Sequence, residues 1–490
     1  YHSVPESRQS DFGTIDKPLR LNIYFDGQEK DAYHSGMGAA RFDYQIHDSL
    51  KMSLSASLFQ TSEQEFYDVE AQYWLGQLDN SLGSDNFGEV VANRGVGGYF
   101  RHARNELFAQ VYNTQYRGKW YRNKTTLEWG AKYQHEFIDD RLKEWQLIDS
   151  SGFSMPQGLD SLVEIYEYVQ SENELSSSRL SSYVQQNGQF DLDSTSLKYS
   201  VGFRTHYWSM NGELFVSPRA ALSYKPNWEK DVLLRLAIGS YNQSPFYREL
   251  RDKEGKVFTD LKSQKSTHFV LSSDYNFQAW NRPFKFVGAV YYKALKDIIP
   301  YEIDNLRIRY LPSLTATGYT TGVDLRVNGE FVPGVESWAS LSLMKSEEDI
   351  LGDGHGYIAR PTDQRFSFSL FFQDYFPRNP SYKMNLKMHY SSGLPTGAIN
   401  SARHEQTVRI PAYRRVDIGF SKVIKDGEKG SQSKYIKHFE SLWLSAEVFN
   451  LLGIRNTISY LWVTDVIQNQ YAVPNYLTSR LLNLKLQAKF

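Results

Sequence analysis

The sequence predicts an all-β protein, a large antiparallel transmembrane β-barrel that crosses the membrane with strands. Three observations support this fold class. Apolar and polar residues alternate strictly at the C-terminus, the alternation recurs along the chain, and the connections between the alternating segments fall into a short and a long class. A period of two is required where one face of every strand meets lipid and the other meets a polar lumen.

The C-terminal segment, residues 477–490, shows the alternation most clearly. Its apolar positions are separated from one another by Asn, Lys or Gln, and they are Leu482, Leu484, Leu486, Ala488 and Phe490. A single segment of this kind also fits a half-buried strand of a soluble sheet. Recurrence of the pattern therefore decides between the two interpretations.

The alternation does recur. Its apolar positions include Phe42, Tyr44 and Ile46; Met52, Leu54, Ala56 and Leu58; Leu127, Trp129, Ala131 and Tyr133; Phe366, Phe368, Leu370 and Phe372; Tyr382, Met384, Leu386, Met388 and Tyr390; Val416, Ile418 and Phe420; and Leu442, Leu444, Ala446 and Val448. The intervening Lys383, Asn385, Lys387 and His389 would be costly in a protein core but suit a wet lumen. We expect about eighteen strands, with ends placed to within a few residues.

Composition narrows the alternatives. A mean hydropathy of -0.53 with 23% charged residues excludes a helical membrane protein, and no apolar run reaches the roughly twenty residues that a spanning helix needs. The aromatic content of 15% suits two interfacial girdles of a barrel. Cysteine is absent, which removes thiolate and disulfide chemistry. A net charge of -1 gives no reason to expect a nucleic-acid partner.

The connections are expected to differ at the two ends of the barrel, with short turns on the periplasmic side and long loops outside. The expected short turns are 47–50, 118–124, 226–231, 278–283, 332–337 and 376–381, and a longer charged connection, 425–437, is placed with them. The expected long loops are 77–104, 138–176, 243–263, 348–363, 393–412 and 451–475. Within the second loop, residues 160–170 suit a short amphipathic helix or a strand extension.

Several short stretches, in this order and at strand ends, resemble the barrel of a TonB-dependent outer-membrane receptor from about residue 39 to residue 490. They are Ser217-Pro218-Arg219, Gly239-Ser240-Tyr241-Asn242-Gln243-Ser244-Pro245-Phe246, Ala316-Thr317-Gly318-Tyr319 with Gly322-Val323-Asp324, Arg360-Pro361-Thr362-Asp363-Gln364-Arg365, Gly393-Leu394-Pro395-Thr396-Gly397, Arg409-Ile410-Pro411-Ala412-Tyr413 with Arg415-Val416-Asp417, and Val448-Phe449-Asn450-Leu451-Leu452-Gly453. We interpret them as barrel-building features, with prolines at strand starts, Gly318 and Gly322 at bends or bulges, and Asn450 at a strand end.

The resemblance implies a family barrel of about twenty-two strands, which is about four more than this chain supplies. It also implies a plug domain that engages TonB ahead of the barrel. We expect residues 1–38 to be an N-terminal segment entering the barrel as a loop or an early strand, and residues 39–490 to form the barrel. The plug is expected to lie outside this chain. Unpaired strand edges are costly in lipid. The missing strands are therefore expected to come from residues outside this sequence or from a separate chain. The alternative is that the barrel closes at a smaller size.

The function implied by the resemblance is energised import across the cell outer membrane. An external ligand, which is a siderophore, cobalamin, an oligosaccharide or a peptide, would bind the loops, and TonB would act through the plug. The expected partners are outer-membrane lipid, the TonB complex and, as an open alternative, a surface lipoprotein. A second function class also stays open, in which the barrel is a passive channel or the anchor of a surface assembly.

An enzyme is not expected. No G-x-S-x-G nucleophile elbow is present, and His404-Glu405 lacks the second histidine of a zincin helix. No catalytic residue, cofactor or metal site is therefore predicted, and the acidic, glycine-rich stretch 349–355 lacks the full calcium-loop pattern. The residues expected to face a ligand are aromatic, amide, acidic and histidine side chains of the long loops, namely Asn86, Phe87, Tyr99, Trp145, Tyr166, Asp353 and His355.

Overall fold

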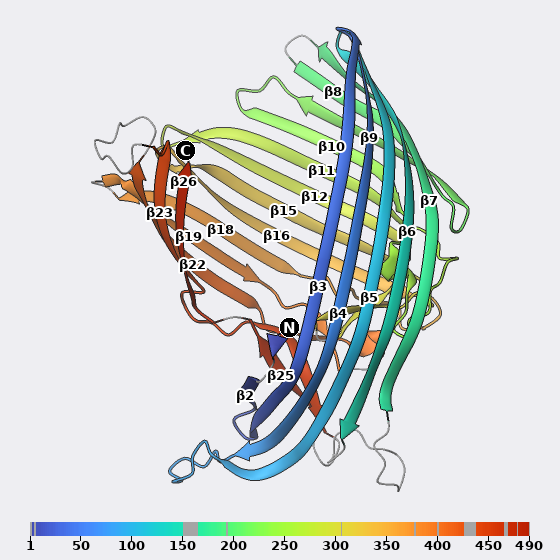
Figure 1. Ribbon diagram of the computed structural model, residues 1–490. Coiled ribbons are helices and arrows are strands. Elements are labelled where there is room, and N and C mark those ends of the chain that lie inside the picture. Colours follow the sequence, from blue (N-terminus) through green and yellow to red (C-terminus); the bar gives the residue numbers. More distant parts are fainter. Residues whose placement is uncertain are drawn as a thin grey trace.

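The computed structural model describes residues 2–3, 6–149, 165–192, 195–304, 306–376, 379–398, 401–425, 438–464, 469–477 and 479–489. Within them, one antiparallel sheet of twenty strands contains nearly all of the regular structure. Figure 1 shows this sheet curled into an incomplete cylinder, with β3 in blue and β26 in dark red at its two edges. The predicted all-β antiparallel fold class is confirmed.

The strands of the main sheet follow one another as a meander, and each long strand pairs with the next long strand along the chain. Their bounds are β1 His2–Ser3, β2 Glu6–Gly13, β3 Pro18–His47, β4 Leu50–Leu78, β5 Val90–Arg122, β6 Thr125–Asp149, β7 Ile165–Leu192, β8 Thr195–Trp208, β9 Glu213–Lys225, β10 Asp231–Gln243, β11 Gln264–Ala279, β12 Arg282–Ile298, β15 Ala316–Val332, β16 Val335–Ile350, β17 Tyr357–Ala359, β18 Phe366–Phe376, β19 Asn379–Ser391, β22 Tyr413–Lys425, β23 Ser441–Phe449 and β26 Leu481–Lys489.

Among the described residues, three separate hairpins and two short helices lie in the connections. The hairpins are formed by β13 Tyr301–Asp304 with β14 Arg307–Tyr310, β20 Pro395–Thr396 with β21 Val408–Arg409, and β24 Thr457–Thr464 with β25 Gln470–Tyr476. The helices are α1 Tyr247–Leu250 and the 3-10 helix η1 Arg403–Glu405. No helix of the described residues has the length and apolarity needed to cross a bilayer.

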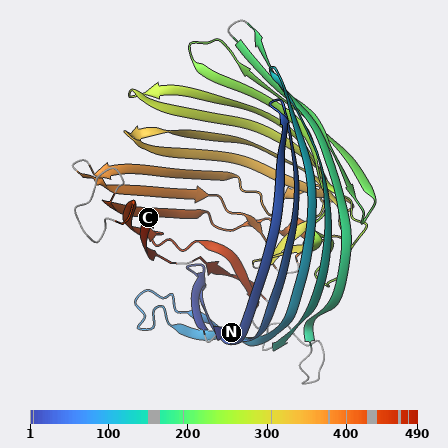
Figure 2. The ribbon, with the colours of Figure 1, turned by 45° about the horizontal axis from the view of Figure 1, so that its top comes forward.

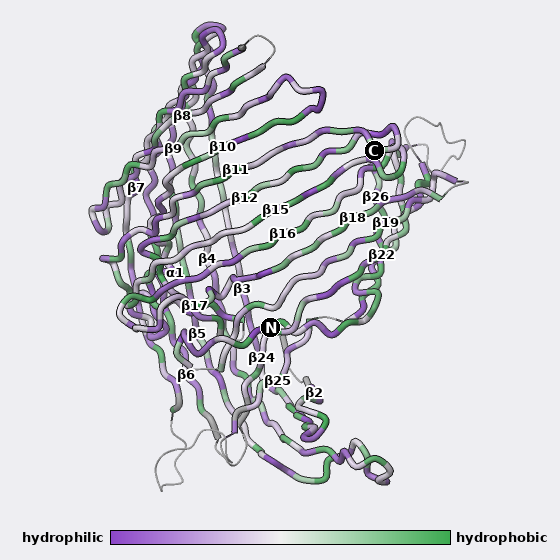
Figure 3. Tube along the Cα trace, turned by 180° about the vertical axis from the view of Figure 1, so that it is seen from behind, coloured by the Kyte–Doolittle hydropathy of each residue, from purple (hydrophilic) through white to green (hydrophobic). Residues whose placement is uncertain are grey.

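The outer face of the sheet is apolar over a central band. Cross-strand register places Leu484 of β26 beside Ala446 of β23, and Leu271 of β11 between Leu236 of β10 and Val290 of β12. These large side chains are exposed, with Leu484 69% and Leu271 56% accessible. Figure 3 shows hydrophobic and hydrophilic positions interleaved along the strands. A band of exposed apolar side chains is what a lipid-facing surface requires.

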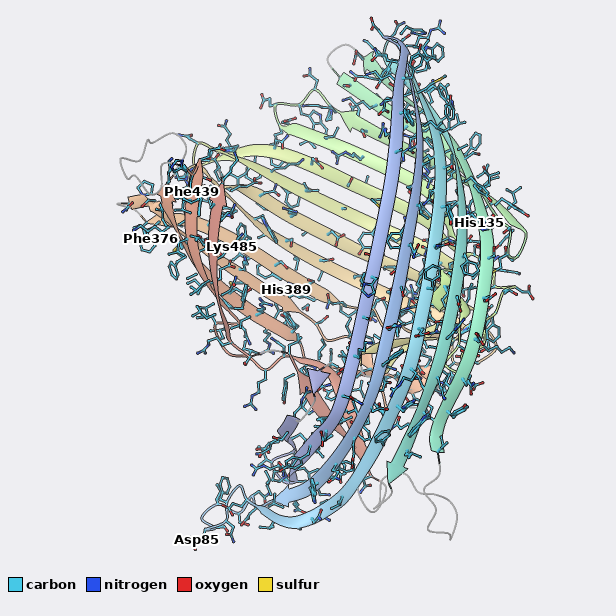
Figure 4. All side chains as sticks on the ribbon, viewed as in Figure 1. Asp85, His135, Phe376, His389, Phe439 and Lys485 are labelled. Carbon is cyan, nitrogen blue, oxygen red and sulfur yellow. The ribbon has the colours of Figure 1, made fainter. Side chains whose placement is uncertain are left out.

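The inner face is polar. Arg235 and Lys285 both contact the carboxylate of Asp274 at 2.7 Å, and Lys387 contacts Glu447 at 3.1 Å. Figure 4 labels two further polar residues of this face, His389 on β19 and Lys485 on β26. The ion pairs show that charges on adjacent strands neutralise one another on the side away from the apolar band.

Strands β3 to β7 run far past the apolar band. β4 has 29 residues and β5 has 33, whereas a tilted membrane strand needs about nine to eleven. The expected loop 77–104 is therefore mostly strand, since only residues 79–89 connect β4 to β5, and the expected loop 138–176 is strand up to Asp149 and again from Ile165. Of the segment 160–170, the described part, from Ile165, is a strand extension.

The extensions form because their inner face is covered. Leu21, Tyr73 and Leu75 are almost fully buried in a cluster with Val473, which the β24–β25 hairpin supplies from the other end of the sequence. The hairpin thus buries apolar area that a free extension would expose to water. Local sequence could not show this, because the covering residues are about 400 positions away.

The predicted short turns are confirmed at 47–50, 118–124, 226–231, 278–283 and 332–337, where consecutive long strands meet. The connection 376–381 and the charged connection 425–437 lie partly or wholly outside the described residues. We refer to this end of the sheet as the short-turn end, and to the opposite end as the long-loop end.

The two edge strands are not paired with each other in the part of the chain that the structure describes. β26 pairs with β23 alone. Among the described residues, β3 pairs with β4 along its length, and its other edge pairs with β2 and β1 near the long-loop end, which leaves residues 31–47 of that edge without a neighbouring strand. One expected alternative was that this chain closes into a smaller barrel. The described residues do not show such closure, because β3 and β26 do not pair with each other.

We predict that the two faces of β26 tolerate charge differently. Leu484→Arg places a cation on the lipid-facing side and should cost roughly 2 to 4 kcal/mol near the bilayer midplane, whereas Lys485→Ala on the inner side should cost little. Urea midpoints of the two variants in lipid vesicles measure the difference. Equal midpoints would contradict the assignment of the two faces.

Candidate functional site

The long connections gather on the inner side of the extended strands at the long-loop end. In Figure 2 the connections after β10 and β12, in green and yellow, lie against the inner side of the extended strands. Two of these connections contact the wall formed by β4, β5, β6 and β7 through arginine side chains. These are the α1 connection, residues 244–263, and the β13–β14 connection, residues 299–315.

The wall presents carboxylates at the point of contact. Register places Glu65 of β4 opposite Asn105 of β5, and Glu144 of β6 opposite Ala103 of β5. The Asn105 amide donates to Glu65 at 3.2 Å and to Glu144 at 2.6 Å, so it holds the two acids in one patch. Two carboxylates this close favour a cation beside them.

Arg307 of the β13–β14 hairpin supplies that cation. Its guanidinium donates to Glu65 at 3.2 Å and to the Tyr67 hydroxyl at 3.3 Å, and lies 3.8 Å from Glu144. Burial lowers the pKa of Arg307, but the neighbouring Tyr67, Glu65 and Glu144 outweigh burial and hold that pKa above its ordinary value. The hairpin is thus fastened to a wall in which Glu65 and Tyr67 lie about 240 positions earlier in the sequence.

The α1 connection is fastened in the same way. Asp140, which is nearly fully buried on β6, accepts from the Tyr247 hydroxyl and from Arg251, each at 2.5 Å. Burial and the hydrogen bond to Asp140 raise the pKa of Tyr247. Arg248 lies 4.0 Å from Glu63 on the same wall.

The two fastened connections also touch each other, because the Phe246 ring packs edge-on against Tyr310 at 5.9 Å. Arg309 adds a further contact to the wall, 3.5 Å from Glu167 of β7. Together these contacts hold both connections against the inner side of the wall. We call this set of arginines and carboxylates the loop clasp: Arg248, Arg251, Arg307 and Arg309 with Glu63, Glu65, Asp140, Glu144 and Glu167.

A second charged network lies at the same end, around β16 to β18, and it contains residues of the family-like stretches. Glu348 is fully buried and accepts from Arg360 at 3.0 Å and from Arg403 at 2.9 Å. Asp363, also fully buried, accepts from Arg365 and Arg409 and from the Ser346 amide. Buried carboxylates saturated by arginines in this way join loops to strand ends.

Other family-like stretches interlock at a strand end. The Asn450 backbone amide donates to Asp417 at 2.8 Å, and Arg415 donates to the same carboxylate at 2.7 Å. Asn450 has a positive φ of 50°, as expected where a strand ends in a tight turn. A bend was expected to explain the glycine at position 322, but the structure gives another explanation. A Cβ at this position would lie 2.5 Å from the Tyr291 hydroxyl. Close approach of an inner-face ring requires this glycine.

The residues expected to face a ligand do not form one group. Asn86 and Phe87 lie in the 79–89 connection, whose tip at Asp85 is labelled in Figure 4. Tyr99 is on β5, not in a loop, and packs against the apolar cluster beneath the β24–β25 hairpin. Burial raises the pKa of its hydroxyl. Tyr99 thus packs beneath the β24–β25 hairpin.

Trp145 lies on the opposite face of the wall. Its indole stacks on His102 at 4.9 Å and on Phe100 at 5.3 Å, on the outer side of the extended strands. Tyr166 belongs to β7, and its side chain is outside the described residues. Tyr99 and Trp145, expected together in long loops, therefore point to different sides of the sheet.

Asp353 and His355 do come together, in the turn between β16 and β17, where Asp353 accepts from the His355 amide at 2.9 Å. The His355 ring stacks on His404 with 3.5 Å between centroids. Within the described residues, no group of three or more His, Asp or Glu side chains has the arrangement of a metal site.

The loop clasp is the part of the site that sequence reasoning missed. The connection 299–315 was not among the expected long loops, and Glu65 and Glu144 fell within segments whose register was unknown. The available signal was the excess of arginine in two connections, Arg248, Arg251, Arg307 and Arg309, over a wall rich in glutamate.

An antiparallel sheet with an apolar outer band, a charged inner face and long loops clasped at one end defines the wall of an outer-membrane β-barrel. A family model described as "TonB dependent receptor-like, beta-barrel" matches residues 4–451. The chain belongs to that family, which is one of receptors and transporters that depend on TonB and lie in the cell outer membrane.

Solved structures agree with the fold. The outer membrane transporter YddB from Escherichia coli matches with a TM-score of 0.52 and 11% identity, over 96% of this chain and 76% of that chain. The copper transporter OprC matches with a TM-score of 0.52 and 10% identity, over 98% and 77%. FpvAI, in its complex with pyocin S2, matches with a TM-score of 0.50 and 11% identity, over 95% and 68%. No curated protein matches the sequence.

We predict that Arg307→Ala loosens the β13–β14 hairpin. The side chain is about half exposed, so the loss of its contacts should cost on the order of 1 kcal/mol and raise amide exchange in the hairpin about fivefold. Hydrogen exchange of peptides covering 299–315 measures the effect, with Lys230→Ala at the short-turn end as the control. Unchanged protection would show that the clasp does not hold the hairpin.

Proposed function

We propose that this chain forms the barrel wall and the external loops of a receptor that imports a ligand into the periplasm with energy delivered through TonB. Membership of the family and the charged inner face support the proposal, because a wet inner face lets a hydrated ligand pass along the wall. The ligand classes in question are siderophores, cobalamin, oligosaccharides and peptides.

The observation that carries this proposal is the loop clasp. A passive pore needs no cover at its outer end, whereas a receptor that holds its ligand before transport does. Arg307 and Arg251 fasten two connections across the inner side of the wall, and the half-exposed contact of Arg307 with Glu65 opens at low cost. A ligand bound outside would compete for the same carboxylates and loops.

The TonB-engaging plug and the strands that complete the barrel are proposed to come from outside this chain. The open edges of β3 and β26 support this, because a lipid-exposed edge leaves N–H and C=O groups unpaired at several kcal/mol each. We keep the division into an entering segment, residues 1–38, and a barrel, residues 39–490, as part of the proposal.

The test is uptake by cells that express the complete receptor, with and without TonB. Labelled ferric siderophore, cobalamin, an oligosaccharide pool and a peptide pool serve as probes. We expect one class to enter only when receptor and TonB are both present. Uptake that persists without TonB would contradict energised import and favour passive diffusion. A steady single-channel conductance in planar bilayers would then support passive diffusion.

A second candidate function is attachment of a surface partner, such as a lipoprotein. The aromatic group on the outer side of the extended strands favours it. Tyr24 and Trp74 pack edge-on at 5.4 Å and are 53% and 39% exposed, and Trp145 stacks on Phe100 and His102 on the same side of the extended strands. Exposed aromatic groups beyond the lipid band suit protein contacts. Co-purification of a surface protein that is lost on Trp74→Ser would support this role.

A further inference from the structure

The β13–β14 hairpin has two chemically different faces. Arg307 and Arg309 of β14 point to the wall, where they contact Glu65 and Glu167. Side chains that alternate with these arginines along the strand belong to the opposite face. That face is formed by two cross-strand pairs, Ile303 with Ile308 and Tyr301 with Tyr310, and its tyrosine rings pack at 5.8 Å between centroids. The hairpin thus turns an apolar face away from the wall.

The aliphatic part of this face is open to solvent in the described part of the chain. Ile303 is 41% exposed and Ile308 is 53% exposed, although both lie on paired strands. Leu306, at the tip of the hairpin, is 60% exposed. The Phe246 ring packs on Tyr310 and extends the apolar surface toward α1. An exposed apolar surface with charged residues beside it is typical of a binding site.

The backbone edges of the hairpin are unpaired as well, among the residues that the structure describes. β13 and β14 form a two-stranded sheet of their own, in which each strand pairs only with the other. The Leu311 amide donates to the Pro300 carbonyl at 2.9 Å, so these two residues form a hydrogen-bonded pair. Hydrogen-bonded and non-hydrogen-bonded pairs alternate along an antiparallel ladder. The backbone N–H and C=O groups that point outward from the hairpin are therefore those of Tyr301, Ile303, Ile308 and Tyr310.

We infer that this hairpin binds an extended peptide, which adds a third strand to one of its edges. The outward N–H and C=O groups on each edge recur at every second residue, about 6.8 Å apart, and an extended peptide offers complementary groups at the same spacing. Alternate side chains of such a peptide lie on the apolar face of the hairpin. The ligand is thus a peptide with apolar side chains at every second position over at least four residues, the length of β13 and of β14.

This inference rests on the proposed function, because it names the class of ligand that the receptor imports. Among the four classes in question, an extended peptide is the one built throughout from alternating N–H and C=O groups. An oligosaccharide favours exposed aromatic rings, on which its sugar rings stack, whereas the exposed centre of this face is aliphatic, with Ile303 and Ile308. The shape of the hairpin therefore favours a peptide over the other three classes.

The test uses the complete receptor in detergent micelles and fluorescein-labelled hexapeptides, whose dissociation constants are measured by fluorescence anisotropy. The parent peptide is Thr-Val-Thr-Val-Thr-Val. Two isomers of it carry N-methyl groups, one on the valine amides and the other on the threonine amides. A strand that pairs through one edge loses its donors in only one of these isomers.

One methylated isomer is expected to bind at least about tenfold more weakly than the parent, because each backbone hydrogen bond strengthens binding about fivefold. The other isomer keeps its hydrogen bonds and should bind within about twofold of the parent. Each isomer is the control for the other, since both carry the same number of N-methyl groups. Amide exchange resolved to single residues should slow on one edge when the parent peptide is bound, either at Tyr301 and Ile303 or at Ile308 and Tyr310.

A variant of the receptor tests the apolar face. Ile303→Thr with Ile308→Thr keeps β-branched residues on both strands but removes apolar contact, and should weaken binding of the parent peptide about tenfold, since each buried methylene group contributes about fourfold. The matched control is Leu351→Thr in the turn between β16 and β17, where the side chain is 57% exposed. This control should bind like the unaltered receptor.

Equal weakening by the two methylated isomers, or no binding of the parent peptide, would overturn the inference. Edge amides that are already protected without peptide would show that another part of the receptor covers the hairpin, and would overturn it as well. TonB-dependent import of a different ligand class would overturn this inference and keep the proposed function. Peptide uptake that does not need TonB would instead overturn only the proposed function.

Discussion

Backbone pairing is the constraint on which the rest of this structure depends. Within a bilayer no water is available to an unpaired N–H or C=O group, so each strand must be hydrogen-bonded to its neighbours along its whole buried length. The meander from β3 to β26 meets this requirement by pairing every long strand with the next. Once the backbone is fixed in this way, side chains alternate between lipid and lumen, and the apolar band and the charged inner face follow together.

The same constraint explains why the long-loop end has a different chemistry. Beyond the lipid band the outer face is free to carry polar groups, and the inner face can pack against the loops. The extensions of β3 to β7 are held by an apolar cluster under the β24–β25 hairpin and by the loop clasp under the α1 and β13–β14 connections. Carboxylates of the wall meet arginines of the loops here, whereas on β10, β11 and β12 the inner-face charges pair with one another across neighbouring strands.

Sequence reasoning succeeded where the pattern is local and failed where it is not. The alternation around Leu484 and Lys485, the short turns and the family-like stretches were readable because strand period and turn chemistry are set by adjacent residues. The extensions were predicted as loops because residues such as Asp140, Glu144 and Glu167 break the alternation, and their partners Arg251, Arg307 and Arg309 are over a hundred positions away. Tyr99 and Trp145 were both expected in long loops, whereas both lie on strands, Tyr99 against the inner apolar cluster and Trp145 stacked on His102 on the outer side.

The most direct test is of the two-faced wall itself. Because the chain contains no cysteine, single cysteines carrying nitroxide spin labels can be placed along β11 from His268 to Tyr275, and their accessibility to oxygen and to a water-soluble nickel complex measured in lipid vesicles. A lipid-facing outer side and a wet inner side predict that oxygen accessibility peaks at Phe269, Leu271, Ser273 and Tyr275, and that nickel accessibility peaks at the positions between them. Accessibilities that do not alternate with a period of two would contradict the barrel wall and everything inferred from its inner face.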